Sequence, residues 1–356
     1  MLYSNMEHPL TMAYLDITSD SKIKTMTYVP RLFFFLSVWR LRGFRIIHIH
    51  WLYKFRLPSR IPLSGQAAFI NTLMFFYVLK LLGYRVVWTV HNVLPHEPIT
   101  SNDLCIRKKL GTITSAAIVH SPTTIPELEK LGIKLNSVHI VPHGTYQGAY
   151  PDNLSRDRVR NLLGIGSKEF VFLFFGRVET YKNVLELIEA FKKLMKTQKS
   201  ITLIIAGNAS GALKIAIKKE KLEIGKKLVT KLSYIPDNEV QVYFRAADVA
   251  VYPFQEITTS GSVIAALSFG VPIIAPRLGS LKDVPNGVGF FYETSDKNGL
   301  SKAMKRAIEN KSLVSQKGKA AKHYAESLAW DKSAAITYQI YEKVLATPTS
   351  ENRRAR

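Results

Sequence analysis

The sequence predicts an α/β protein of two units, each a parallel β-sheet covered by helices. Short β-branched runs alternate with stretches of helical period, which is typical of parallel sheets. The alternation stops between residues 144 and 166, where glycine, proline, asparagine and charged residues lack a sustained apolar period, and then restarts. The 356 residues suffice for two domains with a core each, and 47% of them are hydrophobic.

The expected elements follow this alternation. Before the linker we expect strands at 45–50, 86–91, 117–120 and 138–141, with helices at 65–82 and 124–131. After it we expect strands at 170–175, 201–206, 229–232, 249–252 and 272–275, and helices at 184–195, 213–220, 238–246 and 262–269. A final helical region spans about 300–345.

We place the boundary near Tyr150, which gives an N-terminal domain at 1–150 and a second domain at 151–330. A C-terminal helix and a short basic tail then occupy 331–356. Ligands of such sheets bind outside the carboxyl ends of the strands. The loops after Phe175, Ala206 and Tyr252 are therefore the places where we expect a site.

The composition indicates an anionic partner. The formal net charge is +22, and the excess of lysine and arginine is spread over both halves. A single cysteine, Cys105, excludes an internal disulfide framework and fits a reducing compartment; we expect it to be a small packing residue.

The apolar runs at 32–39 and 61–83 do not predict a transmembrane helix, because the first is too short and the second carries polar residues and a lysine. Arg31, Arg40, Arg42 and Arg45 bracket the first run. We expect these segments either to rest on an anionic membrane surface or to cover the sheet as ordinary helices.

A first candidate site follows the strand at 170–175. Gly176 lets a ligand approach the backbone, and Arg177 and Lys182 lie five residues apart before the next helix. A guanidinium can bind two phosphate oxygens at once, and an ammonium adds a compact positive charge. The alternative is a solvated turn that happens to be basic.

A second candidate site follows the strand at 249–252. Ser260, Gly261 and Ser262 precede a helix, where free N–H groups at its positive end suit a phosphate. The alternative is ordinary capping of the helix by a hydroxyl side chain.

In this order the two clusters resemble the C-terminal donor domain of family-4-like GT-B glycosyltransferases. The matching segments are LFFGRVETYKNVLELIEAFKKL, ITLIIAGNAS, YIPDNEVQVYFRAADVAVYPF and ALSFGVPIIAP. Upstream, the segments VVWTVHN, AAIVHSPTTIPELEKLGI and VHIVPHG resemble strand ends of the family's first domain. The resemblance covers roughly residues 85–355 and includes a terminal helix after Trp330 that returns to the first domain.

The resemblance implies a GT-B fold, in which two Rossmann-like domains face each other across a cleft. The first domain would bind an acceptor and the second a nucleotide-sugar donor, which is a substrate; no cofactor and no metal are implied. Retention of the anomeric configuration is favoured over inversion. The implied donor-binding residues are Gly176, Tyr234, Ile235, Glu256, Ser260, Gly261 and Ser262, and the implied catalytic residues include His91, Arg177 and Lys182.

Among these residues, Arg177 and Lys182 would hold the diphosphate and stabilise the charge that grows on the leaving nucleotide. Tyr234 and Ile235 would lie beside the base, and Glu256 would hold ribose or sugar hydroxyls. His91 would reach the transferred sugar.

The sequence departs from the family pattern in two places. Ala265 stands where the second motif glutamate is usual, and counting back places Ile257, rather than Glu256, at the first. The glycine-rich loop that usually approaches the phosphate from the first domain is missing, since Gly43 is the only glycine before Gly65.

Polar side chains cluster after the strand that ends near His91. His91 and His96 are five residues apart without a predicted helix, which does not indicate a zinc site. An inverting enzyme needs a base for the acceptor hydroxyl, and Glu97 or His96 could supply it. The alternative for His91 is a structural role that ties its loop to the fold.

We therefore expect transfer of a hexose from a UDP- or GDP-sugar to a glycolipid or polysaccharide precursor, in the cytoplasm or on the inner membrane face. A soluble acceptor such as a protein or small sugar is the alternative within this class. A basic nucleic-acid-binding α/β protein is the alternative from another class, but no RNA- or DNA-binding motif is present and we expect no nucleic acid partner.

Overall fold

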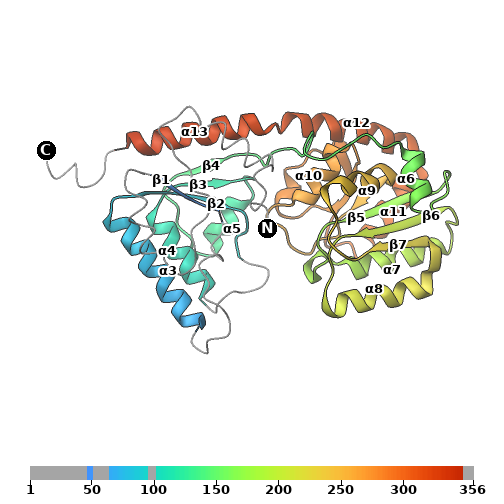
Figure 1. Ribbon diagram of the computed structural model, residues 1–356, viewed down its shortest axis with the longest axis horizontal. Coiled ribbons are helices and arrows are strands. Elements are labelled where there is room, and N and C mark those ends of the chain that lie inside the picture. The colour runs from blue at the N-terminus through green and yellow to red at the C-terminus, as the bar shows by residue number, and fades with distance from the viewer. Residues whose placement is uncertain (1–45, 51–63, 95–101, 348–356) are drawn as a thin grey trace. The chain divides into compact units, whose positions relative to one another are not determined.

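The computed structural model describes residues 46–50, 64–94 and 102–347, which form two compact units (Figure 1). Unit 1 combines the chain up to His143 with the chain from Trp330 onward, and unit 2 spans Gly144–Ala329. The linker composition led us to expect a division near Tyr150. The chain divides earlier, shortly after the last strand of unit 1.

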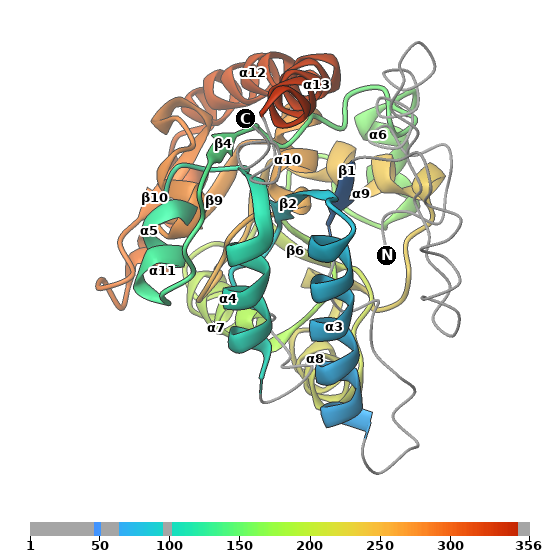
Figure 2. The same ribbon diagram turned by 90° about the vertical axis from the view of Figure 1, so that its left-hand side faces the viewer.

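The described residues of unit 1 form a four-stranded parallel sheet in the order β1-β2-β3-β4. Its strands are β1 (Ile46–Ile49), β2 (Arg85–Val90), β3 (Thr114–Val119) and β4 (Val138–Ile140). Its helices are α3 (Ser64–Leu81), α4 (Asp103–Ile113), α5 (Thr124–Lys130) and α13 (Trp330–Ala346). Figures 1 and 2 both show α3 and α4 side by side.

Alternate residues of β2 divide the core of unit 1 between two faces. Trp88 packs into the cluster that contains Phe76 of α3 and Leu110 of α4. Val87 faces the other way and packs with Tyr341 of α13. Successive side chains of a strand point to opposite faces, so both faces of this sheet are covered by helices. The C-terminal helix therefore completes the core of the N-terminal sheet.

Unit 2 is a six-stranded sheet in the order β10-β9-β8-β5-β6-β7, with every described pair parallel. Its strands are β5 (Phe170–Phe175), β6 (Ile201–Ala206), β7 (Leu228–Lys231), β8 (Val249–Val251), β9 (Ile273–Pro276) and β10 (Gly289–Tyr292). Its α-helices are α6 (Arg156–Leu162), α7 (Val184–Met195), α8 (Gly211–Ile224), α9 (Val240–Ala246), α10 (Gly261–Ser268), α11 (Gly299–Glu309) and α12 (Lys311–Ser327).

The strand order of unit 2 creates a switch point beside β5. From β5 the chain runs to β6 and β7 on one side, and β8, β9 and β10 then continue on the other side. The crevice outside the carboxyl ends of β5 and β8 is the position where open sheets of this kind bind ligands. Both candidate clusters of unit 2 follow these two strands.

Among the α-helices and strands that the structure describes, three were missing from the sequence prediction: α4, α6 and β10. Helix α6 lies within the segment that we interpreted as linker. Its sequence is mostly charged, and the buried Arg160 holds it to the sheet through a 2.9 Å ion pair with Asp248. Val159 is the one apolar side chain of this helix that enters the core, so no apolar period in the sequence revealed the helix.

The structure also bears on the expectations for Cys105 and for a transmembrane helix. Cys105 is exposed on α4, so our prediction of a packing residue was wrong. None of the helices that the structure describes is both long and apolar enough to span a bilayer. The run at 32–39 and the arginines that bracket it lie outside the described residues.

Candidate functional site

The site in unit 2 begins where β5 ends. Gly176 has a φ of +127°, a backbone conformation that residues with a side chain rarely adopt. Its N–H donates to the carbonyl of Ala206, and Val178 N–H donates to Asn208, each over 2.9 Å. A methyl group on Gly207 would lie 2.0 Å from the carbonyl oxygen of Gly176. The loops after β5 and β6 are therefore in close backbone contact at this edge of the sheet.

Lys182 and Ser262 converge on Gly176 from two different loops. A methyl group on Gly176 would lie 3.4 Å from Ser262 Cβ and 3.7 Å from Lys182 Nζ. Lys182 ends the short 3-10 turn η2 (Thr180–Lys182), and Ser262 is the second residue of α10. The structure thus brings the two predicted clusters together, at the switch point of the sheet.

The ammonium group of Lys182 is half-buried, and burial lowers the pKa of Lys182 to about 8. Glu179 raises this pKa and Arg177 lowers it, but both effects are smaller than that of burial. No carboxylate among the described residues forms an ion pair with Lys182 Nζ. A bound anion would therefore stabilise the charged form of this lysine.

The first turn of α10 supplies hydrogen-bond donors to the same place. Ser260 caps the helix, since its hydroxyl accepts from Val263 N–H over 3.4 Å and lies 2.9 Å from the hydroxyl of Ser262. The N–H groups of Gly261 and Ser262 lie in the first turn, where the helix provides no acceptor. Capping and anion binding are compatible here, because the Ser260 hydroxyl caps the helix while the N–H groups of Gly261 and Ser262 can donate to an anion.

Arg177 does not join this group directly. Its side chain is 73% exposed, and its Nη2 forms a 2.7 Å ion pair with Glu179 Oε1. Burial and the nearby Glu179 raise the pKa of the Tyr181 hydroxyl above its usual value. The loop therefore carries a surface pair, Arg177–Glu179, beside the half-buried Lys182.

The loop between β8 and α10 places Glu256 and Ile257 differently. Glu256 is exposed, whereas Ile257 is 7% exposed and belongs to the core. Glu256 lies near enough to Tyr181 to raise its pKa, and Gln255 N–H donates to the Tyr181 carbonyl over 2.9 Å. Of the two, only Glu256 has its side chain at the surface.

Aromatic residues that the sequence analysis did not select line the neighbouring part of unit 2. The rings of Tyr146 and Tyr150 stack with centroids 5.6 Å apart, and a methyl group on Gly261 would lie 2.7 Å from Tyr146 Oη. Tyr234 is 72% exposed and close enough to Tyr150 to influence its pKa, while Ile235 is buried. Tyr146 and Tyr150 follow the segment VPHG, and this pair of tyrosines could have indicated the aromatic contact from the sequence.

Unit 1 holds a different constellation, a row of five histidines. The ring centroids of successive members lie between 4.1 and 5.5 Å apart, and a tryptophan continues the row at 5.4 Å. One or two histidines come from the carboxyl end of each of the four strands. In order along the row they are His48, His50, His91, His120 and His143, followed by Trp330.

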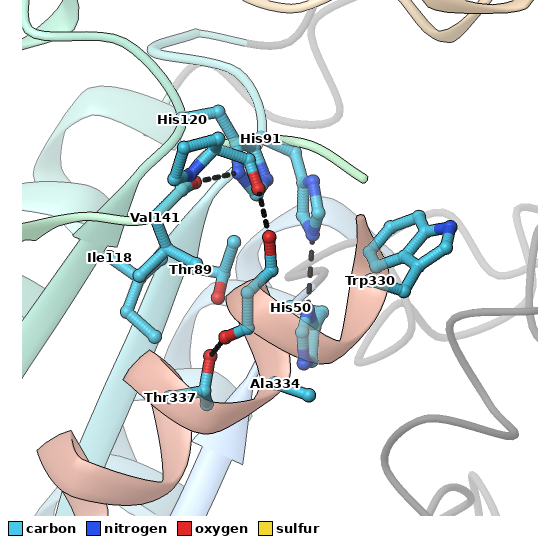
Figure 3. A pocket seen from close by; sticks show the side chains of 11 residues that line it. His50, Thr89, His91, Ile118, His120, Val141, Trp330, Ala334 and Thr337 are labelled. Carbon is cyan, nitrogen blue, oxygen red and sulfur yellow. Dashed lines mark hydrogen bonds between the residues drawn. The ribbon is translucent and has the colours of Figure 1, made fainter. Parts of the chain in front are cut away.

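His91 is the member of this histidine row that the sequence analysis selected. Figure 3 shows it pointing toward His50, and His91 Nε2 lies 3.1 Å from His50 Nδ1. Burial is the main cause that lowers the pKa of His91, and the other histidines add to it because each disfavours a second charge nearby. His91 is therefore a neutral imidazole at neutral pH, able both to donate and to accept a hydrogen bond.

Two other members hold the histidine row to its surroundings. His120 Nδ1 donates to the carbonyl of Val141 over 2.8 Å. His48 lies 2.5 Å from the hydroxyl of Tyr341 and 2.7 Å from that of Thr89, so it connects α13 to β2. Burial lowers the pKa of both histidines.

A cavity of about 20 Å³ adjoins the histidine row, which is room for a single water molecule (Figure 3). Its lining includes His50, Thr89, His91, His120, Trp330 and Thr337. No group of three or more histidine, cysteine, aspartate or glutamate side chains in the described parts of the chain is placed to hold a metal ion. Glu97 and His96, the candidate bases, lie outside the described residues.

Comparison with known proteins identifies the second unit. Residues 155–324 match the model of the family described as glycosyl transferases group 1. The match contains Gly176, Lys182 and the whole of α10, so it includes the site around Gly176.

Curated relatives extend beyond this region. A GDP-mannose:glycolipid 4-beta-D-mannosyltransferase of Xanthomonas campestris pv. campestris is 25% identical over 270 residues, which are 74% of this chain and 71% of the relative. A D-inositol 3-phosphate glycosyltransferase of Paenarthrobacter aurescens (strain TC1) is 25% identical over 235 residues, which cover 64% of this chain and 57% of the relative.

Solved structures show the same fold over most of the chain. Sucrose-phosphate synthase from Thermosynechococcus elongatus matches 91% of this chain and 82% of its own with a TM-score of 0.71 at 19% identity. HepE from Anabaena, solved with UDP-glucose, matches 88% of this chain and 81% of its own with a TM-score of 0.68 at 17% identity. The protein therefore has a GT-B fold, and its residues 155–324 match the glycosyl transferases group 1 family.

Proposed function

We propose that this enzyme transfers a hexose from a UDP- or GDP-sugar to a glycolipid or polysaccharide precursor. The observation that carries the donor half of the proposal is the convergence of Lys182 Nζ, Ser262 and the first turn of α10 on Gly176. A cation and free N–H groups around a glycine form a favourable environment for a diphosphate. Arg177 adds its charge when a ligand draws it away from Glu179.

In this proposal the charges act mainly on the leaving group. As the bond between the sugar and the diphosphate breaks, negative charge grows on the diphosphate oxygen. Lys182 and the α10 donors are already oriented around the place where that charge develops. Glu256 holds hydroxyls of the ribose or sugar, and Tyr234 and Ile235 lie beside the base.

The acceptor half of the proposal is supported by a relative. The Xanthomonas enzyme is named for a glycolipid acceptor, and this favours a lipid-linked acceptor here as well. We place the enzyme in the cytoplasm, peripheral to the inner membrane face. His91 then contacts the transferred sugar, because its neutral ring can donate a hydrogen bond to a hydroxyl without adding charge.

Transfer proceeds with retention in this proposal, and the donor phosphate accepts the acceptor proton. The anomeric configuration of the product, read by NMR, tests this directly. A product of inverted configuration would instead require an enzymic base, for which Glu97 and His96 are the candidates.

The proposal is tested first by thermal shift with UDP, GDP, ADP and their sugars. A ligand that binds only the folded state raises the melting temperature, and at 100 times its Kd the stabilisation is about 2.7 kcal/mol. We expect UDP or GDP to raise the melting temperature of the wild-type protein but not of Lys182→Ala. If no nucleotide shifts the wild type, the donor site is wrongly assigned.

We also propose that the reaction needs no metal ion. The positive charge around Gly176 comes from protein groups, so removal of divalent cations should leave the rate unchanged. Transfer measured with and without EDTA checks this. A loss of activity with EDTA that added Mg²⁺ or Mn²⁺ restores would contradict it.

A further inference from the structure

Helix α3 has an apolar face that the described protein does not cover. Phe76 lies fully buried against the sheet of unit 1, on the opposite side of the helix. The exposed residues are spaced four, three and four positions apart, so they line one side of the helix. They are Ile70, Met74, Tyr77 and Leu81, with 59, 45, 58 and 64% of their surface exposed.

A stripe of this kind differs from ordinary surface exposure. Single apolar residues are common on protein surfaces, whereas contiguous apolar patches mark sites of contact with another surface. Leu82, directly after the helix, continues the apolar surface, since it is also 55% exposed. We therefore expect another surface, its occupant, to cover the apolar stripe of α3.

The charge of the sequence that contains α3, together with the exposed lysines of α3 and α4, indicates the nature of that occupant. No aspartate or glutamate occurs from Ser21 to His96, a segment that includes all of α3. The same segment contains the basic residues Lys22, Lys24, Arg31, Arg40, Arg42, Arg45, Lys54, Arg56, Arg60, Lys80 and Arg85. Lys80 is exposed on α3 itself, and Lys108 and Lys109 are exposed on the adjacent α4 (Figure 2).

We infer that the apolar stripe of α3 docks on an anionic lipid surface. Apolar side chains that enter the boundary between headgroups and acyl chains, with lysines beside them, are the combination that holds a helix in a membrane interface. A second copy of the chain is a poorer occupant, because it would bring the exposed lysines of its α3 and α4 against those of the first copy. The inference builds on the proposed glycolipid acceptor and names the surface that presents it.

The test uses the full chain and flotation with vesicles. Wild-type protein should float with vesicles of phosphatidylcholine and phosphatidylglycerol, and much less with phosphatidylcholine alone. High salt should release it, because counterions screen the lysines from the lipid headgroups. Equal flotation with both kinds of vesicle, or none with either, would overturn the inference.

A matched pair of variants locates the contact. Ile70→Ser with Tyr77→Ser removes two apolar side chains seven residues apart on α3. The control is Ile215→Ser with Leu222→Ser on α8 of unit 2, which also lie seven apart and are 72 and 86% exposed. We expect the α3 variant to partition roughly ten-fold more weakly into acidic vesicles, since two inserted side chains are lost. The α8 variant should partition like the wild type.

Two further measurements distinguish lipid docking from a failed donor site and from dimerisation. Thermal shift by UDP or GDP should be the same in both variants, because none of the substituted residues belongs to the donor site around Gly176. Failure of the donor site would abolish this thermal shift and leave flotation unchanged. Light scattering would detect a dimer that the α3 variant abolishes, and such a dimer would assign the stripe to a second copy instead. Equal partitioning of the α3 variant and the wild type would also refute the inference.

Discussion

Lys182 keeps a positive charge in a half-buried place without a carboxylate partner among the residues that the structure describes. A fully solvated lysine would gain little from a phosphate, because water already stabilises its charge. A lysine whose pKa burial has lowered to about 8 has lost part of that stabilisation and recovers it when an anion binds. The affinity for a diphosphate should therefore depend on pH.

The first prediction concerns this pH dependence. Nucleotide binding favours charged Lys182, so the affinity for UDP or GDP should be highest below pH 8 and should fall as the pH rises through it. Between about pH 7 and pH 9 we expect a loss approaching ten-fold, since the charged fraction of free lysine falls by that factor. Isothermal titration calorimetry at several pH values measures it.

Lys182→Arg is the matched control, because arginine stays charged throughout this range. It should bind the nucleotide with little dependence on pH, and Lys182→Ala should reduce kcat/KM by roughly 10²-fold. A wild-type affinity that stays constant from pH 7 to pH 9 would show that the charge of Lys182 does not contribute.

The second prediction concerns Gly176. Alanine there must adopt a φ of +127° and places a methyl group between Ser262 and Lys182. We expect a loss of about 1–3 kcal/mol in the free energy of unfolding from backbone strain, together with weaker nucleotide binding. Denaturant titration and calorimetry measure the two effects. A Gly176→Ala variant with wild-type affinity would show that the ligand does not approach this backbone.

The third prediction concerns His91. His91→Ala should keep its fold and its affinity for a free nucleoside diphosphate but lose transfer, if the ring contacts the sugar. If its bond with His50 is only structural, the same variant should melt at a lower temperature. His50→Ala complements this variant, because it removes the hydrogen-bond partner of His91 and leaves the His91 ring to contact the sugar. Wild-type transfer by a folded His91→Ala variant would exclude both roles.

At this scale the sequence predicted only what local chemistry determines. Gly176, Lys182 and Ser262 were selected because each follows a recognisable strand, and the structure places them together. The exposure of Arg177 and its pairing with Glu179 depend on how the loop folds, which the spacing does not reveal. The row formed by His50, His91 and their neighbours was also not predicted, because its members come from four separate strands.

At the scale of elements, continuous apolar strands were predictable because their pattern is strong. The bounds of β5, α7 and β6 agree with the prediction at every residue. Helix α4 carries few apolar residues, and β10 is a short strand of four residues, so neither has a pattern that stands out. Such elements depend on neighbours that lie far away in the sequence.

The fourth prediction concerns the contact between α13 and the histidine row. Burial lowers the pKa of His48, His91 and His120, so the folded unit binds fewer protons than the unfolded chain. Above the unfolded-state pKa of about 6.5, these histidines are neutral in both states and do not change the free energy of unfolding. Below it the unfolded chain binds protons that the folded unit does not, so the free energy of unfolding should fall. Thermal unfolding between about pH 7.5 and pH 5 measures this.

His48→Gln should reduce the dependence on pH, because one buried imidazole is removed. His323→Gln is the control, since His323 is exposed on α12 of unit 2 and lies outside the histidine row. If the two variants lose stability equally with acid, the histidine row is not the cause.

At the scale of the whole molecule, the order of elements allowed two α/β units to be predicted, but not their exact membership. The boundary near Tyr150 was estimated from a polar segment, whereas the chain divides after His143 because the residues that follow already pack within unit 2. Thr145, for example, donates its N–H to the carbonyl of Leu328 over 2.8 Å. Contacts of this range have no signature in the local composition.

The fifth prediction follows from the position of α13. A chain that ends at Ala329 lacks Ile340, Tyr341 and Val344, which pack on one face of the unit 1 sheet. We expect unit 1 to lose its cooperative unfolding, while unit 2 unfolds as in the full chain and still responds to UDP or GDP. Calorimetric scans of both chains measure this. Two intact transitions in the shortened chain would show that α13 is dispensable.

The same feature has a consequence for synthesis on the ribosome. Every residue of unit 2 has been translated before α13 exists, so this later unit can fold first, although domains usually fold in the order of their synthesis. Meanwhile the first sheet has one apolar face, including Val87 and Ile118, without its covering helix. The nascent chain thus exposes this face until α13 has been translated, and this is the interval in which chaperones would be most useful to it.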